Sequence, residues 1–267
     1  MKWLESITAG FVTVLLAASI AGAAVSSNTA SEKYDRTFPL SADGTVSLQN
    51  VNGNVTVSAW GNDEIKIAAV EYADDEEELG RVRIEVDPGQ NEIVIRTRYL
   101  DHGSRQHDHG ATVDYVLTVP RNANLNKIMT VNGNVEVSGA TGKITASTVN
   151  GIVDAHGQMR HCDLSSVNGK VEGDFTALRH GSEISMKNVN GKIVVRLPKK
   201  PDASKEASTT SGHIRDEFGL RTSDEGEYGS FVHIGAKLKG KLGRGDASIR
   251  LSTVSGSIEI LRSDSGR

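Results

Sequence analysis

The chain has 267 residues, of which 37% are hydrophobic, and it carries 30 Lys and Arg against 34 Asp and Glu, a formal net charge of −4. This length suffices for one large or two small domains with a core, and the charge balance lacks the overall positive charge of a nucleic-acid-binding protein. A single cysteine excludes an intramolecular disulfide, and 28 glycines with 4% aromatic residues indicate many tight turns.

Residues 1–23 are predicted to be a signal peptide. Lys2 precedes an apolar run from Ile7 to Ala24, and the small residues at 21–23 suit signal peptidase. The alternative is an uncleaved membrane anchor, because about 18 apolar residues lie at the short limit for spanning a bilayer. With cleavage, we expect an exported protein of the periplasm or cell surface that keeps no membrane span.

Residues 31–122 are predicted to form an N-terminal β region that contains the first repeat-like rung. Strand-like alternation separated by turn residues predicts four strands, Glu64–Tyr72, Arg81–Asp87, Glu92–Tyr99 and Thr112–Val119. The acidic run from Asp74 to Glu78 is expected to cap a short helical turn, since acidic side chains suit a helix N-terminus. A cation or partner patch is the alternative for this run.

Three histidines gather with two aspartates between residues 101 and 110. His102, His107 and His109 could hold zinc or copper, because imidazole and carboxylate groups are ligands of both metals. The alternative is a hydrophilic hairpin loop. We favour the loop, since no fixed ligand spacing accompanies the histidines.

Residues 123–262 are predicted to be repeats of a β-solenoid, because a three-residue motif recurs there after one earlier copy at 51–53. The motif is Val-Asn-Gly in the first copies, Thr-Ser-Gly at 210–212 and Val-Ser-Gly at 254–256. From Asn132 the copies follow at 18, 18, 22 and 21 residues, and the last follows after 44, which we interpret as two steps. Asn-Gly and Ser-Gly supply the conformation that a tight corner needs. The predicted corner residues are Asn52, Gly53, Asn132, Gly133, Asn150, Gly151, Asn168, Gly169, Asn190, Gly191, Ser211, Gly212, Ser255 and Gly256.

Positions around each triplet form apolar columns, which predict an all-β fold of rungs about 18–22 residues long. The columns lie three positions after the triplet Asn or Ser, one before it and four before it. Their members in the copy at 149–151 are Val153, Val149 and Ala146. With polar residues between them, these columns indicate half-buried strands with β-branched residues facing inward. Each copy is expected to be two short strands joined at a glycine corner, with the next copy stacked above it.

The single cysteine and the late glycine-rich stretch are placed by the same alignment. In an oxidising compartment a lone thiol suggests an intermolecular bridge or a reactive group. Cys162, however, shares an apolar column with Ile144, Ile184 and Ile249, which favours a buried thiol. The glycine-rich stretch from Thr222 to Gly245 is predicted to be a loop or an irregular rung.

An outward column four places after the triplet Asn carries the carboxylates Glu136, Asp154 and Glu172, with Glu259 in the last copy. Stacked at about 4.8 Å, these like charges repel, so a cation such as calcium could be favoured there. The alternative is a solvated strand face neutralised by Lys170 and Lys192, which we prefer. We therefore expect no cofactor and no resident metal.

Several segments resemble a known family. They are the segment that begins at Trp60 (WGNDEIKI), the strand from Tyr115 to Pro120, the Val-Asn-Gly-x-Val repeats and the closing pattern that begins at Gly243. Together they resemble bacterial exported proteins grouped as putative adhesins, a domain family of unknown function, over residues 40–262. The resemblance implies a β-solenoid and an envelope location, and it implies no catalytic residues.

These observations favour a non-enzymatic, exported, adhesin-like protein that presents a regular surface for binding or self-association. Its expected partner is an unknown protein or an envelope polysaccharide, and no nucleic acid. One alternative is a carbohydrate-active enzyme that uses outward carboxylates such as Asp154 and Glu172. Another is an envelope scaffold or stress-sensing partner protein. The Arg-Gly-Asp tripeptide at 244–246 could mediate host adhesion, although the closing pattern already expects glycines there as a corner.

Overall fold

The computed structural model describes residues 29–100, 111–220, 222–223 and 235–263, and its architecture is all-β with one short helix. The elements in chain order are β1 (Ala30–Pro39), β2 (Thr45–Gln49), β3 (Val55–Trp60), β4 (Glu64–Ala73), α1 (Glu76–Leu79), β5 (Val82–Pro88), β6 (Glu92–Tyr99), β7 (Thr112–Pro120), β8 (Asn124–Met129), β9 (Val135–Ser138), β10 (Lys143–Gly157), β11 (His161–Phe175), β12 (Glu183–Leu197), β13 (Ala203–Ser211), β14 (Ile214–Asp216), β15 (Thr222–Ser223), β16 (Ala236–Leu242), β17 (Ala247–Ser255) and β18 (Ile258–Arg262). The four strands expected between residues 64 and 119 are confirmed as β4 to β7, and each end agrees to within one residue. The expected helical turn is confirmed as α1.

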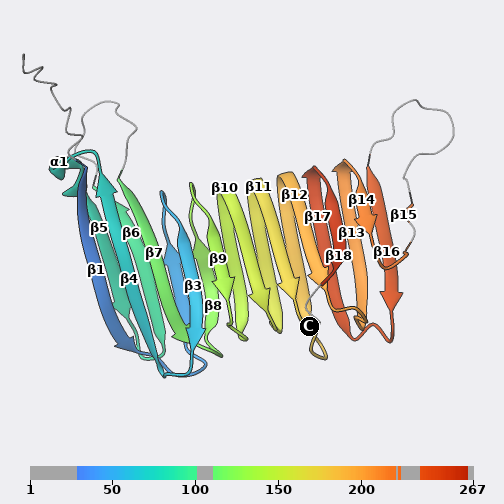
Figure 1. Cartoon of the computed structure of the whole chain (residues 1–267). Coiled ribbons are helices and arrows are strands. Elements are labelled where there is room, and N and C mark those ends of the chain that lie inside the picture. The colour runs from blue at the N-terminus through green and yellow to red at the C-terminus, as the bar shows by residue number, and fades with distance from the viewer. Residues whose placement is uncertain (1–28, 101–110, 221, 224–234, 264–267) are drawn as a thin grey trace, which may run out of the picture.

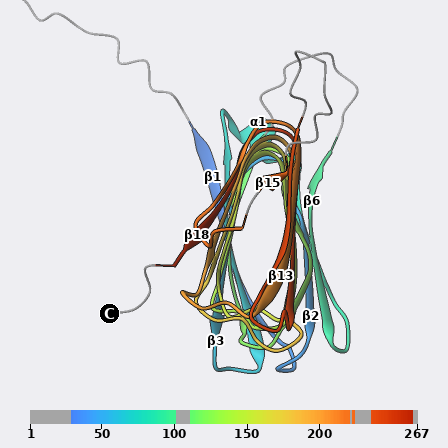
Figure 2. The ribbon, with the colours of Figure 1, turned by 90° about the vertical axis from the view of Figure 1, so that its right-hand side faces the viewer.

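The strands form one mixed sheet folded into two walls. We call them face A, with strand order β1-β4-β7-β3-β9, the second halves of β10, β11 and β12, then β18-β14, and face B, with order β5-β6-β2-β8, the first halves of β10 to β12, then β17-β13-β16-β15. Figure 1 shows the strands side by side along the molecule. Figure 2, which looks along this stack, shows the two walls joined by narrow arches at one edge and by longer loops at the other.

We call these two margins the arch edge and the loop edge. The arch edge carries the Val-Asn-Gly triplets, and here the 15-residue strands β10, β11 and β12 continue from face B to face A with parallel pairing on both sides of the bend. The strands therefore run through the corner, which differs from the expected pair of separate short strands. The loop edge carries the connections between successive rungs.

The triplet glycines bend the chain where no side chain would fit. Gly169 has φ +147°, and a Cβ placed on it would lie 2.0 Å from the carbonyl oxygen of Gly151 in the neighbouring rung. The same close approach to a backbone carbonyl recurs at Gly133, Gly151 and Gly191. The glycine is thus required twice, for its backbone conformation and for the spacing of the rungs.

The core is the space between the two walls, filled by apolar columns that stack in register. Val135, Val153 and Val171 pair with one another from β9 to β11 and are fully buried. The column of Cys162 is confirmed, because Cys162 pairs with Ile144 on one side and Ile184 on the other and is 1% exposed. Each rung therefore buries one apolar layer against the next, which is the main source of its stability.

The valine of each triplet does not face inward, contrary to the sequence expectation. Val167 and Val189 are 38% and 39% exposed, and Val254 is 51% exposed. Inward at the arch lies the residue before this valine, which is small and polar, such as Thr148 or Ser166. The reason is the positive-φ glycine, because it shifts the in-out alternation by one residue between face B and face A.

These inward polar side chains satisfy the arch carbonyls. The hydroxyl of Thr148 donates to the carbonyl of Gly133 at 2.8 Å, and Thr130 makes the same bond to Gly53 at 2.9 Å. In the next rungs Ser166 donates to Gly151 and the Asn188 amide to Gly169. Without such a donor, a buried carbonyl would be left unpaired at every arch.

The last two copies stack in the reverse of their chain order. β17 pairs in parallel with both β12 and β13, and β18 likewise lies between β12 and β14, so the copy at 254–256 sits between those at 189–191 and 210–212. The chain returns through β16, which pairs antiparallel with β13. The 44-residue step is therefore an excursion and a return, and residues 236–242 are a strand where the sequence indicated a loop or irregular rung.

Candidate functional site

The arch edge displays a row of exposed asparagines that are bonded to one another. The Nδ2 of Asn132 donates to Oδ1 of Asn52 and that of Asn150 to Asn132, both at 2.8 Å. Asn168 donates to Asn150, and Asn190 to Asn168, both at 3.0 Å. We call this row the asparagine ladder. It aligns the amide dipoles along the stack, and such chains of bonds strengthen one another.

The sequence placed these asparagines only as turn residues, and the ladder follows from their identical position in every rung. The predicted serines at 211 and 255 occupy the same place beyond Asn190, since Asn190 pairs with Ser255 and Ser255 with Ser211. A repeated Asn at an exposed corner was the available signal, because in-register stacking brings equal side chains within hydrogen-bond reach.

An open, polar cleft of about 640 Å³ lies at the head of this ladder. Its lining includes Asn52, Asn54, Tyr72, Asp74 and Thr112. Asp114 holds one side of this region, because its Oδ1 accepts from the backbone N–H of Asn54 at 2.7 Å. The cleft thus combines amide, carboxylate and hydroxyl groups with one half-exposed aromatic ring.

The carboxylate column expected on the outward face is present on face A. Asp154 pairs with Glu136 on one side and with Glu172 on the other. Glu259 lies two strands further, beyond Val194. Both oxygens of Glu172 are occupied, by Lys170 and by Arg196, and Lys192 pairs with Glu259 at 2.8 Å. The charges of Glu172 and Glu259 are therefore compensated by neighbouring cations.

Two adjacent carboxylates in this column have pKa shifts of opposite direction. Burial raises the pKa of Asp154, Glu172 raises it further, and His156, whose Nε2 lies 3.0 Å from Oδ2, opposes this rise. Burial also acts on Glu172, but hydrogen bonds from Lys170 and Arg196 outweigh it and lower the pKa of Glu172. The Oδ1 atom of Asp154 is buried and has no hydrogen-bond partner.

Metal binding gains no structural support from the described residues. Within residues 29–100, 111–220, 222–223 and 235–263, no three His, Cys, Asp or Glu side chains group as ligands of one ion. The candidates His102, His107 and His109 lie outside the described residues. In the acidic run, Asp75 caps α1 by accepting from the backbone N–H of Glu78 at 2.8 Å.

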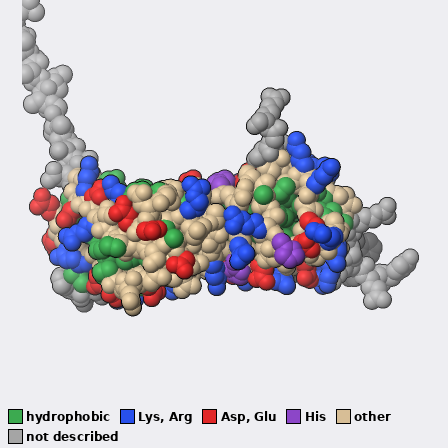
Figure 3. Space-filling model, turned by 90° about the horizontal axis from the view of Figure 1, so that it is seen from below, with side chains coloured by type: hydrophobic (Ala, Val, Ile, Leu, Met, Phe, Trp, Pro, Cys, Tyr) green, Lys and Arg blue, Asp and Glu red, His purple; other side chains and the backbone are tan. Residues whose placement is uncertain are grey.

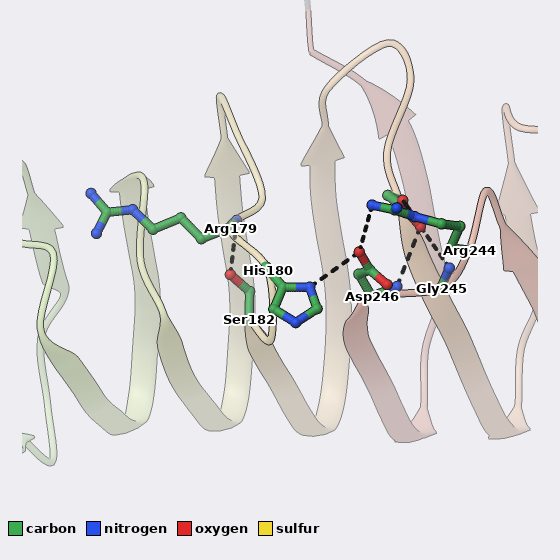
Figure 4. Close-up of polar contacts among 7 residues, drawn as sticks. Arg179, His180, Ser182, Arg244, Gly245 and Asp246 are labelled. Carbon is green, nitrogen blue, oxygen red and sulfur yellow. Dashed lines mark hydrogen bonds and ion pairs between the residues drawn. The ribbon is translucent and has the colours of Figure 1, made fainter.

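The residues of the Arg-Gly-Asp tripeptide make ion pairs and hydrogen bonds with one another and with neighbouring loops, as Figure 4 shows. Arg244 pairs with Asp246 at 3.0 Å and with Asp202 at 3.3 Å, and Asp202 also accepts from the backbone N–H of Gly245 at 2.6 Å. His180 from the preceding loop contacts Asp246 at 3.1 Å. A receptor that reads the arginine and aspartate separately would have to break these contacts, which weakens the host-adhesion hypothesis.

A buried ion pair at the C-terminal end was missed in the sequence. Lys205 and Asp216 are 2.5 Å apart and each side chain is 1% exposed. Lys205 also lies over the ring of Phe218 at 4.5 Å, and burial lowers the pKa of Lys205 against the opposing effect of Asp216. The available signal was a lysine in the inward column that holds Cys162 and Ile249 in other rungs.

The predicted signal peptide, residues 1–23, also lies outside the described residues. Among the residues that are described, no helix has the length and apolar character to cross a membrane.

No family model matches the chain, and no curated protein matches its sequence. Among solved structures, it is similar to a putative cell adhesion protein from Clostridium sporogenes ATCC 15579, with 12% identity, a TM-score of 0.47, and 87% of this chain and 100% of the other covered. It is also similar to a putative adhesin from Bacteroides fragilis NCTC 9343 (9% identity, TM-score 0.35) and a putative lipid binding protein from Parabacteroides distasonis ATCC 8503 (9%, 0.34), each covering 86% of this chain and 97% of the other. Identities and TM-scores this low transfer no function.

Proposed function

We propose that this chain is a β-solenoid that is exported to the bacterial envelope and acts there as an adhesin-like, non-enzymatic binding protein. Its signal peptide would be residues 1–23, and its partner would be an envelope polysaccharide or protein. The observation that carries the proposal is the repetition of the same exposed group in register along the stack, best seen in the asparagine ladder. A straight row of equal groups suits a ligand that is itself a repeating polymer.

The state of the carboxylates supports a role without catalysis. Both oxygens of Glu172 are engaged by cations, so Glu172 is not free to act as a base or a nucleophile. Asp154 is bonded to His156 through Oδ2. A glycosidase instead needs two carboxyl groups that flank the bond to be cleaved.

One observation favours a second candidate, a carbohydrate-cleaving enzyme. Asp154 and Glu172 are neighbours with pKa shifts of opposite direction, which is the arrangement by which a carboxyl pair divides the roles of acid and base. In this candidate Asp154 would be the acid, and Glu172 would have to exchange its cation partners for substrate.

The two candidates are separated by measuring retention and cleavage on the same immobilised cell-wall and plant polysaccharides. The first candidate expects retention of the wild-type protein, no release of soluble sugars, and equal retention of Asp154→Asn. Release of reducing ends by wild type, lost in Asp154→Asn, would overturn the non-enzymatic proposal. Glu136→Gln is the matched control, because it removes a carboxylate from the same column.

A further inference from the structure

The charge of the chain is divided unevenly along its length. Residues 1–142 contain 11 Lys and Arg against 19 Asp and Glu, a net charge of −8, whereas residues 143–267 contain 19 against 15, a net charge of +4. The overall charge of −4 is therefore the sum of an acidic half and a basic half. Among the described residues, β1 to β9 and their loops form one part of the stack and β10 to β18 the other, so for these residues the division in sequence is also a division in space.

A set of exposed cations lies on the loop edge. The turns between successive rungs and the adjoining first position of β10 carry six exposed cations: Arg121, Lys143, Arg160, Arg179, Lys199 and Lys200. Figure 3 looks onto this edge and shows Lys and Arg side chains gathered over its middle and the adjoining C-terminal part. We call these six residues the basic edge.

The cations of the basic edge have no anionic partner among the described residues, in contrast to their acidic neighbours. Asp202 and Asp246, which lie in adjoining loops, are both engaged by Arg244. The loop of Arg179 is held by its backbone N–H, which donates to the hydroxyl of Ser182 at 3.0 Å. As Figure 4 shows, the Arg179 guanidinium points away from the network around Asp246 and along the edge.

The rung repeat sets the spacing of these charges. Arg160, Arg179 and the Lys199-Lys200 pair follow consecutive rungs of the chain, β10, β11 and β12, which pair in parallel at about 4.8 Å per strand. Like charges this close repel one another, and the repulsion is relieved when a polyanion replaces the small counterions. The row is therefore complementary to a polymer that carries negative charges at short, regular intervals.

We propose that the basic edge binds a linear anionic polysaccharide that carries uronate or sulfate groups. This inference rests on the proposed binding function and names the ligand class and the surface. The loops that hold the cations also carry hydroxyl and amide groups that suit sugar hydroxyls, such as Asn122, Thr141 and Thr176. The described loops that hold the cations contain no Phe, Tyr or Trp on which the bases of single-stranded nucleic acid could stack, and their one exposed ring, His180, contacts Asp246, so a nucleic acid is less well matched.

The test measures affinity for three immobilised polymers: polygalacturonate, a sulfated polysaccharide such as heparin, and neutral dextran. The variant Arg160→Gln/Arg179→Gln/Lys199→Gln/Lys200→Gln removes four charges of the basic edge. The control Lys33→Gln/Lys66→Gln/Arg98→Gln/Lys127→Gln removes four exposed cations from the acidic half. All eight side chains lie on the surface, so both variants are expected to melt as the wild type does.

We expect binding to at least one anionic polymer and none to dextran, an affinity loss of about tenfold or more in the basic-edge variant, and a change of less than about threefold in the control. The dependence of log K on log salt should become shallower in the basic-edge variant only, because fewer counterions are released. Equal losses in both variants, or an unchanged salt slope, would contradict the assignment.

Two added probes separate this inference from the proposed function. Tighter binding to single-stranded DNA or to anionic lipid vesicles than to either anionic polysaccharide would overturn the polysaccharide assignment. Retention on neutral envelope glycans without binding to either anionic polysaccharide would overturn this inference alone, whereas sugar release would overturn the non-enzymatic function.

Discussion

The middle and the ends of the stack follow different structural rules. From β9 to β12 each rung copies the one before it, with parallel pairing, a glycine arch, an inward polar donor and an asparagine in the ladder. At the ends, neighbouring strands pair antiparallel: β1 with β4, β4 with β7, β5 with β6, and β16 with β13. Repetition suffices where a rung has two neighbours, but a terminal rung must also close an exposed core and an open sheet edge.

Both ends of the stack carry charged residues that serve this purpose. The edge strand β1 carries Glu32, Lys33, Asp35 and Arg36, which discourages another strand from adding to it. The C-terminal end carries the Lys205–Asp216 pair beneath Phe218, where the middle of the stack has apolar residues. Substitutions in the two regions should therefore destabilise the protein in different ways.

The largest effect is expected at an arch glycine in the middle. Gly169→Ala should lower the free energy of unfolding by more than about 4 kcal/mol, because its Cβ would lie 2.0 Å from a backbone oxygen that cannot move without displacing the neighbouring rung. Gly181→Ala is the control, since Gly181 has φ +71° but open space around it, and should cost only about 1–2 kcal/mol. Denaturant unfolding measures both, and equal costs would show that the stacking contact is unimportant.

At the C-terminal end, Lys205→Met should cost about 3 kcal/mol, because Asp216 is left buried without its cation. The double variant Lys205→Met/Asp216→Asn removes the uncompensated charge and should recover at least half of the loss. Thermal unfolding with hydrogen exchange should place the damage in β13 and β14. A double variant as unstable as the single one would contradict the charge explanation.

The corrected alternation at the arch predicts a smaller effect. Thr148→Val keeps the shape of the side chain but removes the donor to the Gly133 carbonyl, and should cost about 1–2 kcal/mol. Val167→Thr, on the exposed side of the next arch, should change stability by less than about 0.5 kcal/mol. If the valine change were the more harmful of the two, the inward assignment of the polar column would be wrong.

The smallest effects concern the pH dependence of two neighbouring carboxylates. The pKa of Glu172 is lowered in the folded state, so Glu172 stabilises the fold above its ordinary pKa of 4.5 and loses this contribution as pH falls through the lowered value. Glu172→Gln should thus be about 1 kcal/mol less stable than wild type at pH 7, with the difference vanishing in acid.

Asp154 should show the opposite sign. Its pKa is raised in the folded state, so ionisation at neutral pH opposes folding, and this penalty disappears as pH falls through the raised value toward the ordinary 3.8. Asp154→Asn should therefore be as stable as wild type or slightly more stable at pH 7 and lose that advantage in acid. Urea unfolding of both variants between pH 3 and pH 7 measures the two trends, and trends of the same sign would contradict the assignment.

The sequence by itself determined the register of the repeated rungs. The pairing of Cys162 with Ile184 across a four-residue insertion, and the alignment of Glu136, Asp154 and Glu172, could be predicted because strand side chains alternate with a period of two and equal positions stack. The same alignment contained the asparagine ladder and the lysine at position 205, whose meaning depends on what lies beside them.

Only the tertiary structure decided three further features. The exposure of Val167 depends on how a positive-φ glycine resets the alternation, and a linear pattern does not record that bend. The insertion of β17 between β12 and β13, and of β18 between β12 and β14, was undetermined, because equivalent rungs offer equivalent pairing partners and the chain can return to any of them. The opposite pKa shifts of Asp154 and Glu172 depend on the burial of Asp154 and on Arg196, which lies 24 residues from Glu172 along the chain, since electrostatic interactions follow distance in the fold and not separation along the chain.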